Sequence, residues 1–335
     1  MKTYLTNTLA FSSPALLFAT STEAEFIWDG EIELGNEQII NSDAPANEVR
    51  DTFLAIDLNG VYSFANGVEF FAGIAADSVS HPTNDRTMED IGVYVHELGF
   101  RYSIRSTTIT VGKVSPAFGQ GWDVPAGFFG TSVAADYEMV EQIGLLADFD
   151  LGEAGVLSAG VFFLDISAHS DSWGHKRGRN SVALGGAGNT GKLDNFAVAW
   201  NSDIGNSSVN LGARFLSAGV GDVGDETGLV AGLGHSFASG IDLFGEIALF
   251  DNFAGSADSA TFATLNAAYS VGDWSISGTL SQRDLETQGE TDLFSLGTDY
   301  TFGNGASLGG AVARVDNDGV NDTTIGISLV VPLNG

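Results

Sequence analysis

An alternation of apolar and polar residues with a period of two runs through most of this chain. In residues 292 to 302, Phe294, Leu296, Tyr300 and Phe302 share one face, while small or polar residues share the other. Successive side chains of a strand point to opposite faces, so this pattern is typical of a strand with one apolar side. The sequence therefore predicts an all-β protein. The same pattern occurs in residues 54 to 64, 274 to 281 and 323 to 331.

Tight-turn signals and longer polar connections alternate between these segments. The tight-turn signals contain residues, mostly Gly and Asn, that tolerate the positive φ of a short hairpin. They lie at 65–67, near Arg105 and Ser106, and at 152–155, 204–206, 239–240, 272–273 and 303–305. The longer connections lie at 35–49, 81–90, 115–136, 168–191, 219–226, 251–259, 284–290 and 316–321. Seven tight turns join fourteen strands, and strands near 25–34 and 322–333 bring the predicted total to sixteen.

The composition of the two strand faces predicts the environment of the sheet. The second face consists of Gly, Ser, Ala, Asn and scattered Asp, whereas the exposed face of a soluble sandwich is rich in Lys, Glu and Thr. Lipid cannot satisfy an open sheet edge, so we expect an antiparallel barrel, and sixteen strands leave a water-filled lumen. Aromatic residues near the tight turns predict a band at one membrane boundary. They are Tyr62, Phe64, Phe100, Tyr102, Phe149, Trp200, Phe237, Tyr269, Trp274, Tyr300 and Phe302.

The overall composition excludes several classes of protein. Acidic residues number 43 against 13 basic residues, a formal charge of −30. Nucleic-acid binding is excluded, because neutralising phosphates requires clustered Lys and Arg. A hydrophobic content of 44% gives the chain too much apolar surface to remain disordered. Without cysteine, disulfides and thiolate chemistry are excluded.

The first residues have the features of an export signal. Lys2 supplies a charged start, residues 9–20 supply a short apolar stretch, and residues 22–24 match a small-x-small cleavage pattern. We therefore expect a signal peptide over residues 1–24 and a barrel domain over 25–335. A buried N-terminal strand is the alternative.

The connection 115–136 is unusual because it is rich in aromatic residues. Pro and Gly prevent a long helix or a regular strand there. Exposed aromatic side chains favour aggregation, so we expect the loop to fold into the barrel and narrow the pore. The side chains expected to pack against the wall are those of Phe118, Trp122, Phe128 and Phe129, and the carboxylates expected to face the channel are those of Asp123, Asp136 and Glu138.

The sequence in and around this loop also resembles that of the general diffusion porins of Gram-negative outer membranes, especially the alphaproteobacterial type. The residues that carry the resemblance are Gly112-Lys113, Pro116–Gly119, Trp122-Asp123, Gly127–Thr131 and Asp136–Glu138. It implies a sixteen-stranded, usually trimeric barrel in the outer membrane, with the third long loop as the constriction. The partners implied are membrane lipid and lipopolysaccharide, small hydrophilic solutes and ions, and further copies of the chain.

The inward face carries charges that predict ion preference. Because successive side chains of a strand alternate between its two faces, the charges expected to point inward can be counted, and most of them are carboxylates. A pore lined by carboxylates concentrates cations. The alternatives are that these carboxylates pair across the wall or that the negative potential lies on outer loops. If Arg101, Arg214 and Lys113 also face these loop carboxylates across the constriction, a transverse field results. The remaining site candidates are Asp57, Glu69, Glu97 and Asp299, and the same alternation places Asp29, Glu31, Glu33, Asp242 and Glu246 inward.

Other motifs are better explained as loops. Residues 186–192 match the glycine and lysine spacing of a phosphate-binding loop, but Leu193 replaces the required hydroxyl residue and a strand pattern follows. Residues 316–322 faintly resemble a calcium loop without its distal glutamate. We expect no cofactor and no metal site beyond weak calcium binding at acidic outer loops.

The sequence thus predicts a passive channel rather than an enzyme, with a modest cation preference. The alternatives are a substrate-specific channel for a sugar or organic solute, a structural or adhesive barrel with a plugged lumen, and a soluble β-sandwich.

Overall fold

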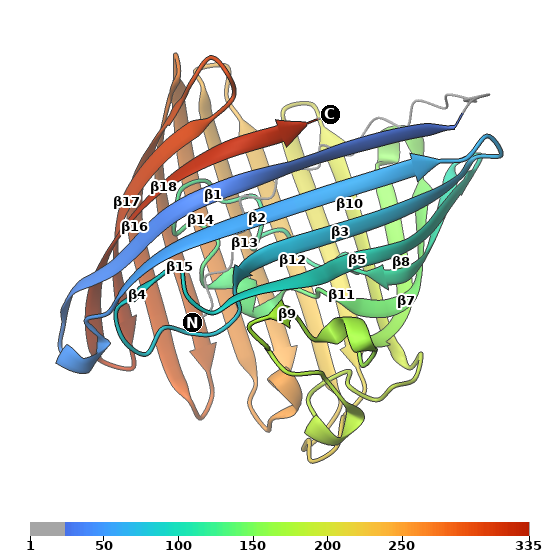
Figure 1. Cartoon of the computed structure of the whole chain (residues 1–335), viewed down its shortest axis with the longest axis horizontal. Helices are drawn as coiled ribbons and strands as arrows, with labels where there is room; N and C mark the ends of the chain where they lie inside the picture. Colours follow the sequence, from blue (N-terminus) through green and yellow to red (C-terminus); the bar gives the residue numbers. More distant parts are fainter. Residues whose placement is uncertain (1–23, 335) are drawn as a thin grey trace.

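The computed structural model describes residues 24–334, which form a closed antiparallel barrel of sixteen strands, as predicted (Figure 1). Each wall strand pairs with the next, and β1 pairs with both β2 and β18, which closes the sheet. The wall strands are β1 (Glu25–Ser42), β2 (Arg50–Ser63), β3 (Val68–Ser78), β5 (Ile91–Ile104), β6 (Thr107–Val114), β7 (Gln142–Asp150), β8 (Val156–Leu164), β10 (Asn195–Ile204), β11 (Ser207–Leu216), β12 (Glu226–Ser236), β13 (Ile241–Asp251), β14 (Ala260–Val271), β15 (Trp274–Leu285), β16 (Gly289–Thr301), β17 (Ser307–Asn317) and β18 (Val320–Asn334).

Short elements occur only in the connections of the described chain. They are the two-residue strands β4 (Arg86–Thr87) and β9 (Trp173–Gly174), and the 3-10 turns η1 (Pro45–Asn47), η2 (Ala134–Tyr137), η3 (Gly152–Ala154), η4 (Ala168–Ser170), η5 (Val182–Leu184) and η6 (Phe253–Gly255). Within residues 24–334, no helix is long and apolar enough to cross a membrane. The predicted signal peptide lies outside the described residues apart from Ala24.

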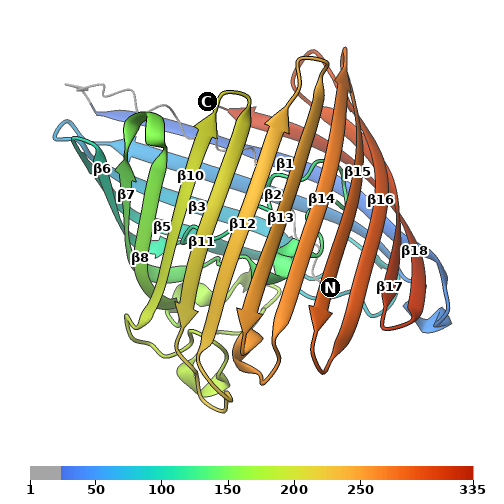
Figure 2. The same cartoon turned by 180° about the vertical axis from the view of Figure 1, so that it is seen from behind.

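The seven predicted tight turns all join neighbouring strands at one end of the barrel, and the long connections lie at the other end (Figure 2). Several of the turns use left-handed glycines, such as Gly205 at φ 64° and Gly240 at φ 83°. Residues 186–192 are followed by β10 rather than by a helix, which agrees with the loop interpretation.

The first strand is longer than the sequence predicted. It was expected to end near residue 34, with a loop over 35–49, but β1 continues to Ser42. The outward positions Asn36 and Gln38 break the apolar alternation and suggested a loop. Asn36 Nδ2 instead donates a hydrogen bond of 2.7 Å to Thr52 Oγ1 on β2, so a polar cross-strand pair continues the ladder.

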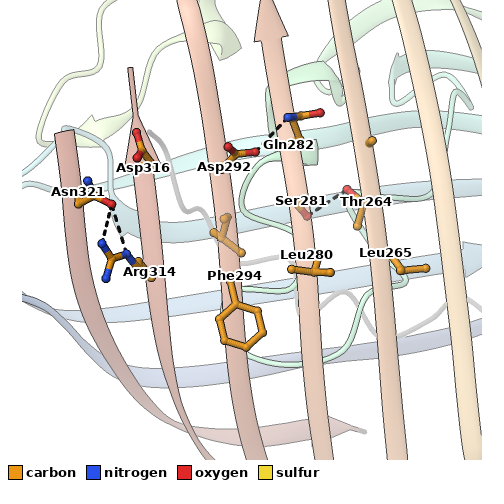
Figure 3. A pocket seen from close by; sticks show the side chains of 12 residues that line it. Thr264, Leu265, Leu280, Ser281, Gln282, Asp292, Phe294, Arg314, Asp316 and Asn321 are labelled. Atoms are coloured by element: carbon orange, nitrogen blue, oxygen red, sulfur yellow. Dashed lines mark hydrogen bonds between the residues drawn. The ribbon is translucent and has the colours of Figure 1, made fainter. Parts of the chain in front are cut away.

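The outward face has an apolar belt that ends abruptly toward the long loops. On β15 and β16, Leu280 and Phe294 are exposed to the outside, and the next outward positions are Gln282 and Asp292. Figure 3 shows this boundary in a hollow of the outer surface, with Gln282 bonded to Asp292 at 3.1 Å. A belt of exposed apolar side chains bounded by polar residues is typical of a surface that contacts lipid.

Aromatic residues, most of them exposed, border the belt at the tight-turn end, as the sequence predicted. Tyr62 and Phe64 lie beside the β2–β3 turn with ring centroids 4.9 Å apart. Trp274 and Tyr300 stand opposite each other beside the β14–β15 and β16–β17 turns, 5.0 Å apart.

Candidate functional site

The loop between β6 and β7 lies inside the barrel. Both views place it between the strands β1–β3 and the strands β12–β15 (Figures 1 and 2). Its backbone bonds to inward side chains of the latter wall: Asn266 on β14 donates to the carbonyl of Ala126 at 2.9 Å and accepts from its N–H at 3.1 Å. The predicted inward fold of the loop is therefore confirmed.

A single inward carboxylate on β13 holds the first part of this loop. The N–H groups of Gln120 and Gly121 each donate to Glu246 at 2.7 Å, and the Tyr137 hydroxyl donates to the same carboxylate. A Cβ at Gly121 would lie 2.5 Å from the Tyr137 hydroxyl oxygen, so a larger residue there would displace the hydroxyl from its place beside Glu246. The Glu246 carboxylate thus joins both ends of the loop to the wall.

A buried ion pair supports the end of the loop. Arg214 on β11 bonds to Glu226 on β12 at 2.7 Å and donates to the Tyr137 carbonyl at 2.6 Å. The Ala254 N–H donates to the other oxygen of Glu226 at 2.7 Å. Arg214 therefore lies beneath the loop and positions it, rather than lining open water.

The aromatic side chains of the loop form the main core of the described chain with an apolar patch on the inner wall. Phe118 is 1% exposed and packs against Tyr137 and against Phe250 of β13. The Arg214 guanidinium lies 4.8 Å from the Phe118 ring centroid. Each such phenylalanine contributes about 1.5–3 kcal/mol on burial, so packing here fixes the loop as firmly as its hydrogen bonds.

The remaining loop aromatics extend this contact toward β18. Phe128 and Phe129 meet edge to face, with centroids 4.8 Å apart. The Phe128 ring lies over Gly326 of β18, where a Cβ would be 2.4 Å from a ring carbon. Trp122 is partly buried and donates through Nε1 to the Phe118 carbonyl at 3.1 Å.

The three predicted loop carboxylates have different surroundings. Asp136 is bonded to Arg283 of β15, so its charge is balanced by the wall. Glu138 is partly exposed and interacts electrostatically with Asp123. Burial, and then the Asp123 charge, raise the pKa of Glu138 to about 7. Glu138 can therefore change its charge near neutral pH.

Lys113 lies at the junction between the wall and two loops. Its side chain is 3% exposed, and its Nζ contacts Glu141 at 2.8 Å and Asp165 at 2.9 Å. Nζ also donates to the His169 carbonyl at 2.9 Å. Arg177 completes the cluster, with Nη1 donating to Glu141 at 2.7 Å.

The Lys113 cluster lies where a second loop pairs with the barrel wall. β6 pairs with β5 only from Leu98 to Ile104, because the chain then turns into the lumen. Beyond that point, Gly92 and Val93 of β5 pair with β9, which belongs to the loop 165–194. That loop therefore occupies the position beside β5 that the constriction loop vacates.

The wall formed by β1 to β5, across the lumen from the strands that hold the constriction loop, carries most of the other predicted charges. Arg101 lies 3.7 Å from Glu69, its cross-strand partner. Asp57 on β2 lies 3.1 Å from His96 Nε2. The register between β3 and β5 shifts by one residue at Gly73–Ile74, so His96 has no cross-strand partner on β3. His96 and the adjacent Glu97 therefore both face inward. The last member of the predicted set, Asp299, lies beside Gly309 on the inner face of β16 and β17.

Arg214 and Lys113 do not face the loop carboxylates across open water, as the sequence suggested, because both side chains are nearly fully buried. Arg101, Arg214 and Lys113 each bond to a carboxylate other than those of Asp123 and Glu138. Asp136 pairs instead with Arg283. Of the three basic residues, Arg101 alone stays partly exposed, so a transverse field remains a prediction that depends on Arg101.

Several residues that build the site were missed in the sequence. Parity would have placed Glu226 and Asn266 inward, since both fall on the face of Gly228 and Thr264. Tyr137 belongs to the Asp136–Glu138 motif, but the motif does not predict its hydrogen bond to Glu246. No signal in the sequence pairs Lys113 with Asp165, because they meet only when two loops pack together.

Comparisons with known proteins agree with this geometry. No protein-family model and no curated protein matches the sequence. A mutant of the Rh. blastica porin is similar in structure, with a TM-score of 0.62 at 15% identity over 92% of this chain and 100% of that chain. Pseudomonas putida OprB gives 0.63 at 11% identity over 93% and 94%, and an anion-selective porin from Comamonas acidovorans gives 0.60 at 12% over 93% and 100%. The chain therefore has the fold of bacterial porins.

Proposed function

We propose that this chain forms a water-filled channel in the outer membrane of a Gram-negative bacterium and passes ions and small hydrophilic solutes by passive diffusion, with a preference for cations. The observation that carries the proposal is the pairing of an apolar outward belt with an inward face that is polar and acidic around an anchored loop. Such a barrel has no open edge and can span a bilayer around water. The proposed function needs no cofactor and no chemical step.

The charges support the cation preference. Lys113 and Arg214 are both nearly fully buried and paired, so they contribute little positive potential to the lumen. Among the described residues, the inward carboxylates of Glu97 and Asp299 form no ion pair, and that of Asp57 pairs only with His96. Confined negative charge raises the local cation concentration and repels anions.

Reconstitution tests this function directly. We expect the mature protein to produce discrete conductance steps in a planar bilayer in KCl, with a zero-current potential in a salt gradient that indicates potassium preference. The absence of conductance in correctly folded protein would overturn the channel proposal, and chloride preference would overturn the proposed selectivity.

A substrate-specific channel is the second candidate. Trp122 and Phe128 stay partly exposed although they belong to the constriction loop, so they offer ring faces to a sugar or another organic solute. Saturable reduction of the ion current by such a solute would favour this candidate, whereas current proportional to solution conductivity favours general diffusion.

Export, lipid contact and assembly are further parts of the proposal. We expect cleavage after Ala24, contact of the belt with outer-membrane lipid and lipopolysaccharide, and a homotrimer such as the resemblance to porins implies. N-terminal sequencing and chemical cross-linking of the protein purified from membranes test these expectations.

A further inference from the structure

Arg314 is a cation on the outer, lipid-facing side of the barrel. It lies on β17 directly opposite Phe294 of β16, in the last row of outward apolar side chains before the long loops. Its Nε and Nη2 donate to Asn321 Oδ1 at 3.2 and 2.9 Å, and among the described residues Arg314 forms no ion pair. A guanidinium has five N–H donors, so Arg314 keeps donors with which to bind an anion.

A second contact orients the amide that holds Arg314. Asn321 Nδ2 donates to Asp43 Oδ2 at 3.2 Å, and the Asn321 N–H donates to the same oxygen at 3.1 Å. Because the nitrogen of the amide is bonded to Asp43, its oxygen is the atom that accepts from Arg314. Arg314 is therefore a positioned side chain on the outer surface.

Two carboxylates lie one row farther toward the long loops. Asp292 of β16 and Asp316 of β17 are cross-strand partners, and Asp316 lies two residues, about 7 Å, along the strand from Arg314 (Figure 3). Gln282 donates to Asp292 Oδ1 at 3.1 Å, and the Gly319 N–H donates to Asp316 Oδ1 at 2.7 Å. Like charges in directly opposed positions of a sheet destabilise the pair, so a cation between the two carboxylates is favoured.

These charges border a hollow on the outer surface. The hollow has a volume of about 570 Å³, and exposed side chains of Leu265, Leu280 and Phe294 form its apolar part. This volume lies within the range of about 300–1,000 Å³ that small-molecule sites occupy. A molecule that extends through the hollow toward the long loops meets apolar surface first, then the Arg314 cation, and then the two carboxylates.

That order matches the chemistry of an aminophospholipid. In such a lipid, the acyl chains, the phosphate and the ammonium group follow one another from the membrane toward the water. The acyl chain can lie on Leu280 and Phe294, the phosphate can accept hydrogen bonds from Arg314, and the ammonium group can donate to Asp292 and Asp316. A headgroup with negative charges alone would place part of its charge beside these carboxylates, which repel it.

We propose that this hollow binds an aminophospholipid, a lipid with one phosphate and one primary ammonium group such as phosphatidylethanolamine. The aminolipid site consists of Arg314, Asp292 and Asp316 together with the apolar part of the hollow. It rests on the proposed function in one respect, that the barrel lies in a membrane. It goes beyond general lipid contact, because it predicts preference for one headgroup at one place on the wall.

Native mass spectrometry of the mature protein tests the aminolipid site. The protein is released from micelles that contain equal amounts of phosphatidylethanolamine, phosphatidylcholine and phosphatidylglycerol, and the lipid that stays bound is identified. Phosphatidylcholine has a methylated ammonium group without N–H donors, and phosphatidylglycerol has a phosphate but no ammonium group. We expect phosphatidylethanolamine to be retained at least about tenfold more than either, because a hydrogen bond to a charged group is worth as much as a tenfold change.

Variants separate the ammonium contact from the phosphate contact. Asp292→Asn with Asp316→Asn should reduce the preference for phosphatidylethanolamine over phosphatidylcholine to about twofold or less, because neutral amides do not attract the ammonium group. Arg314→Gln should weaken retention of all three lipids at least about fivefold, because the phosphate is common to them. Asp251→Asn is the matched control: it removes an exposed outward carboxylate of β13, outside the hollow, and should keep the wild-type preference.

Equal retention of the three lipids by the wild type overturns the aminolipid site, and so does a preference that the Asp292→Asn/Asp316→Asn variant keeps. Displacement of phosphatidylethanolamine by added lipopolysaccharide would also overturn it, since the hollow would then take a headgroup of a different charge. The result is independent of the channel: a protein that conducts KCl without lipid preference refutes only this inference, whereas one that retains phosphatidylethanolamine but conducts nothing refutes only the proposed conduction.

Discussion

Arg214 and Glu226 form a nearly fully buried ion pair, 2.7 Å long, between neighbouring strands and directly beneath the constriction loop. Their side chains also bond to the loop carbonyl of Tyr137 and to the N–H of Ala254, so the pair connects the wall to two connections. A buried pair with additional hydrogen bonds holds neighbouring segments in one geometry, and removing one partner leaves the other charge uncompensated.

We therefore predict that Arg214→Met destabilises the barrel by about 3–5 kcal/mol. The measurement is urea unfolding of the protein refolded in lipid. Arg101→Met is the control, because its pair with Glu69 is 3.7 Å long and about one third exposed, and such pairs contribute about 0–1 kcal/mol. Equal losses in the two variants would contradict the structural role of Arg214.

Glu246 should control the rigidity of the constriction loop. Glu246→Ala removes the acceptor for the N–H groups of Gln120 and Gly121 and for the Tyr137 hydroxyl. Hydrogen bonds to a charged group contribute about 1.5–3 kcal/mol each, so the loop should leave the wall and fluctuate.

Single-channel recording measures this effect as greater open-channel noise and an altered unitary conductance in Glu246→Ala. Glu290→Gln, a change at an exposed residue on the long-loop rim, should leave both quantities unchanged. A recording of Glu246→Ala that is as quiet as the wild type would argue that aromatic packing alone fixes the loop.

The periodicity of the sequence was sufficient to predict the barrel, because its physical cause is local. Each strand must present one apolar face outward, and each tight turn needs residues that accept positive φ, so both leave a direct signal. The inward fold of the loop was also predictable, since an apolar segment with Pro and Gly has no other buried place.

The ion pairs could not be predicted, because the two-residue alternation shows only which face of the sheet a side chain lies on. Lys113 meets Asp165 through loop packing, and Arg214 was expected to line the lumen but is covered by the loop. The bulge at His96 also breaks the simple two-residue count, so that two successive residues face inward.

Selectivity should depend on pH through Glu138. Its pKa is raised to about 7 by burial and by Asp123, so the group is charged above that pH and neutral below it. Cation preference should therefore fall as the pH is lowered from about 8 to about 6. Zero-current potentials in a KCl gradient measure the change.

The matched variant for this test is Glu138→Gln, which should keep a lower cation preference across the whole pH range. His96→Gln serves as the control, because it removes a titratable imidazole from the inner wall and leaves the loop unchanged, and it should retain the pH dependence of the wild type. If Glu138→Gln retains a wild-type pH profile and His96→Gln loses it, the titrating group is on the wall and not on the loop.

The Lys113 cluster should hold the loop 165–194 against the wall. Lys113→Met leaves the buried Asp165 carboxylate and the partly buried Glu141 carboxylate without this cation, and Arg177 can balance only Glu141. Since an unpaired buried charge is costly, we expect the loop to detach from the edge of β5 and become accessible to protease.

Trypsin should then cleave after Lys176 or Arg177 at least about tenfold faster than in the wild type, because cleavage follows the population of the open form. Arg179→Gln is the control, since its side chain is exposed and, among the described residues, bonds only to the Ile166 carbonyl. Cleavage of Lys113→Met at the wild-type rate would mean that the β5–β9 pairing holds the loop without the ion pairs.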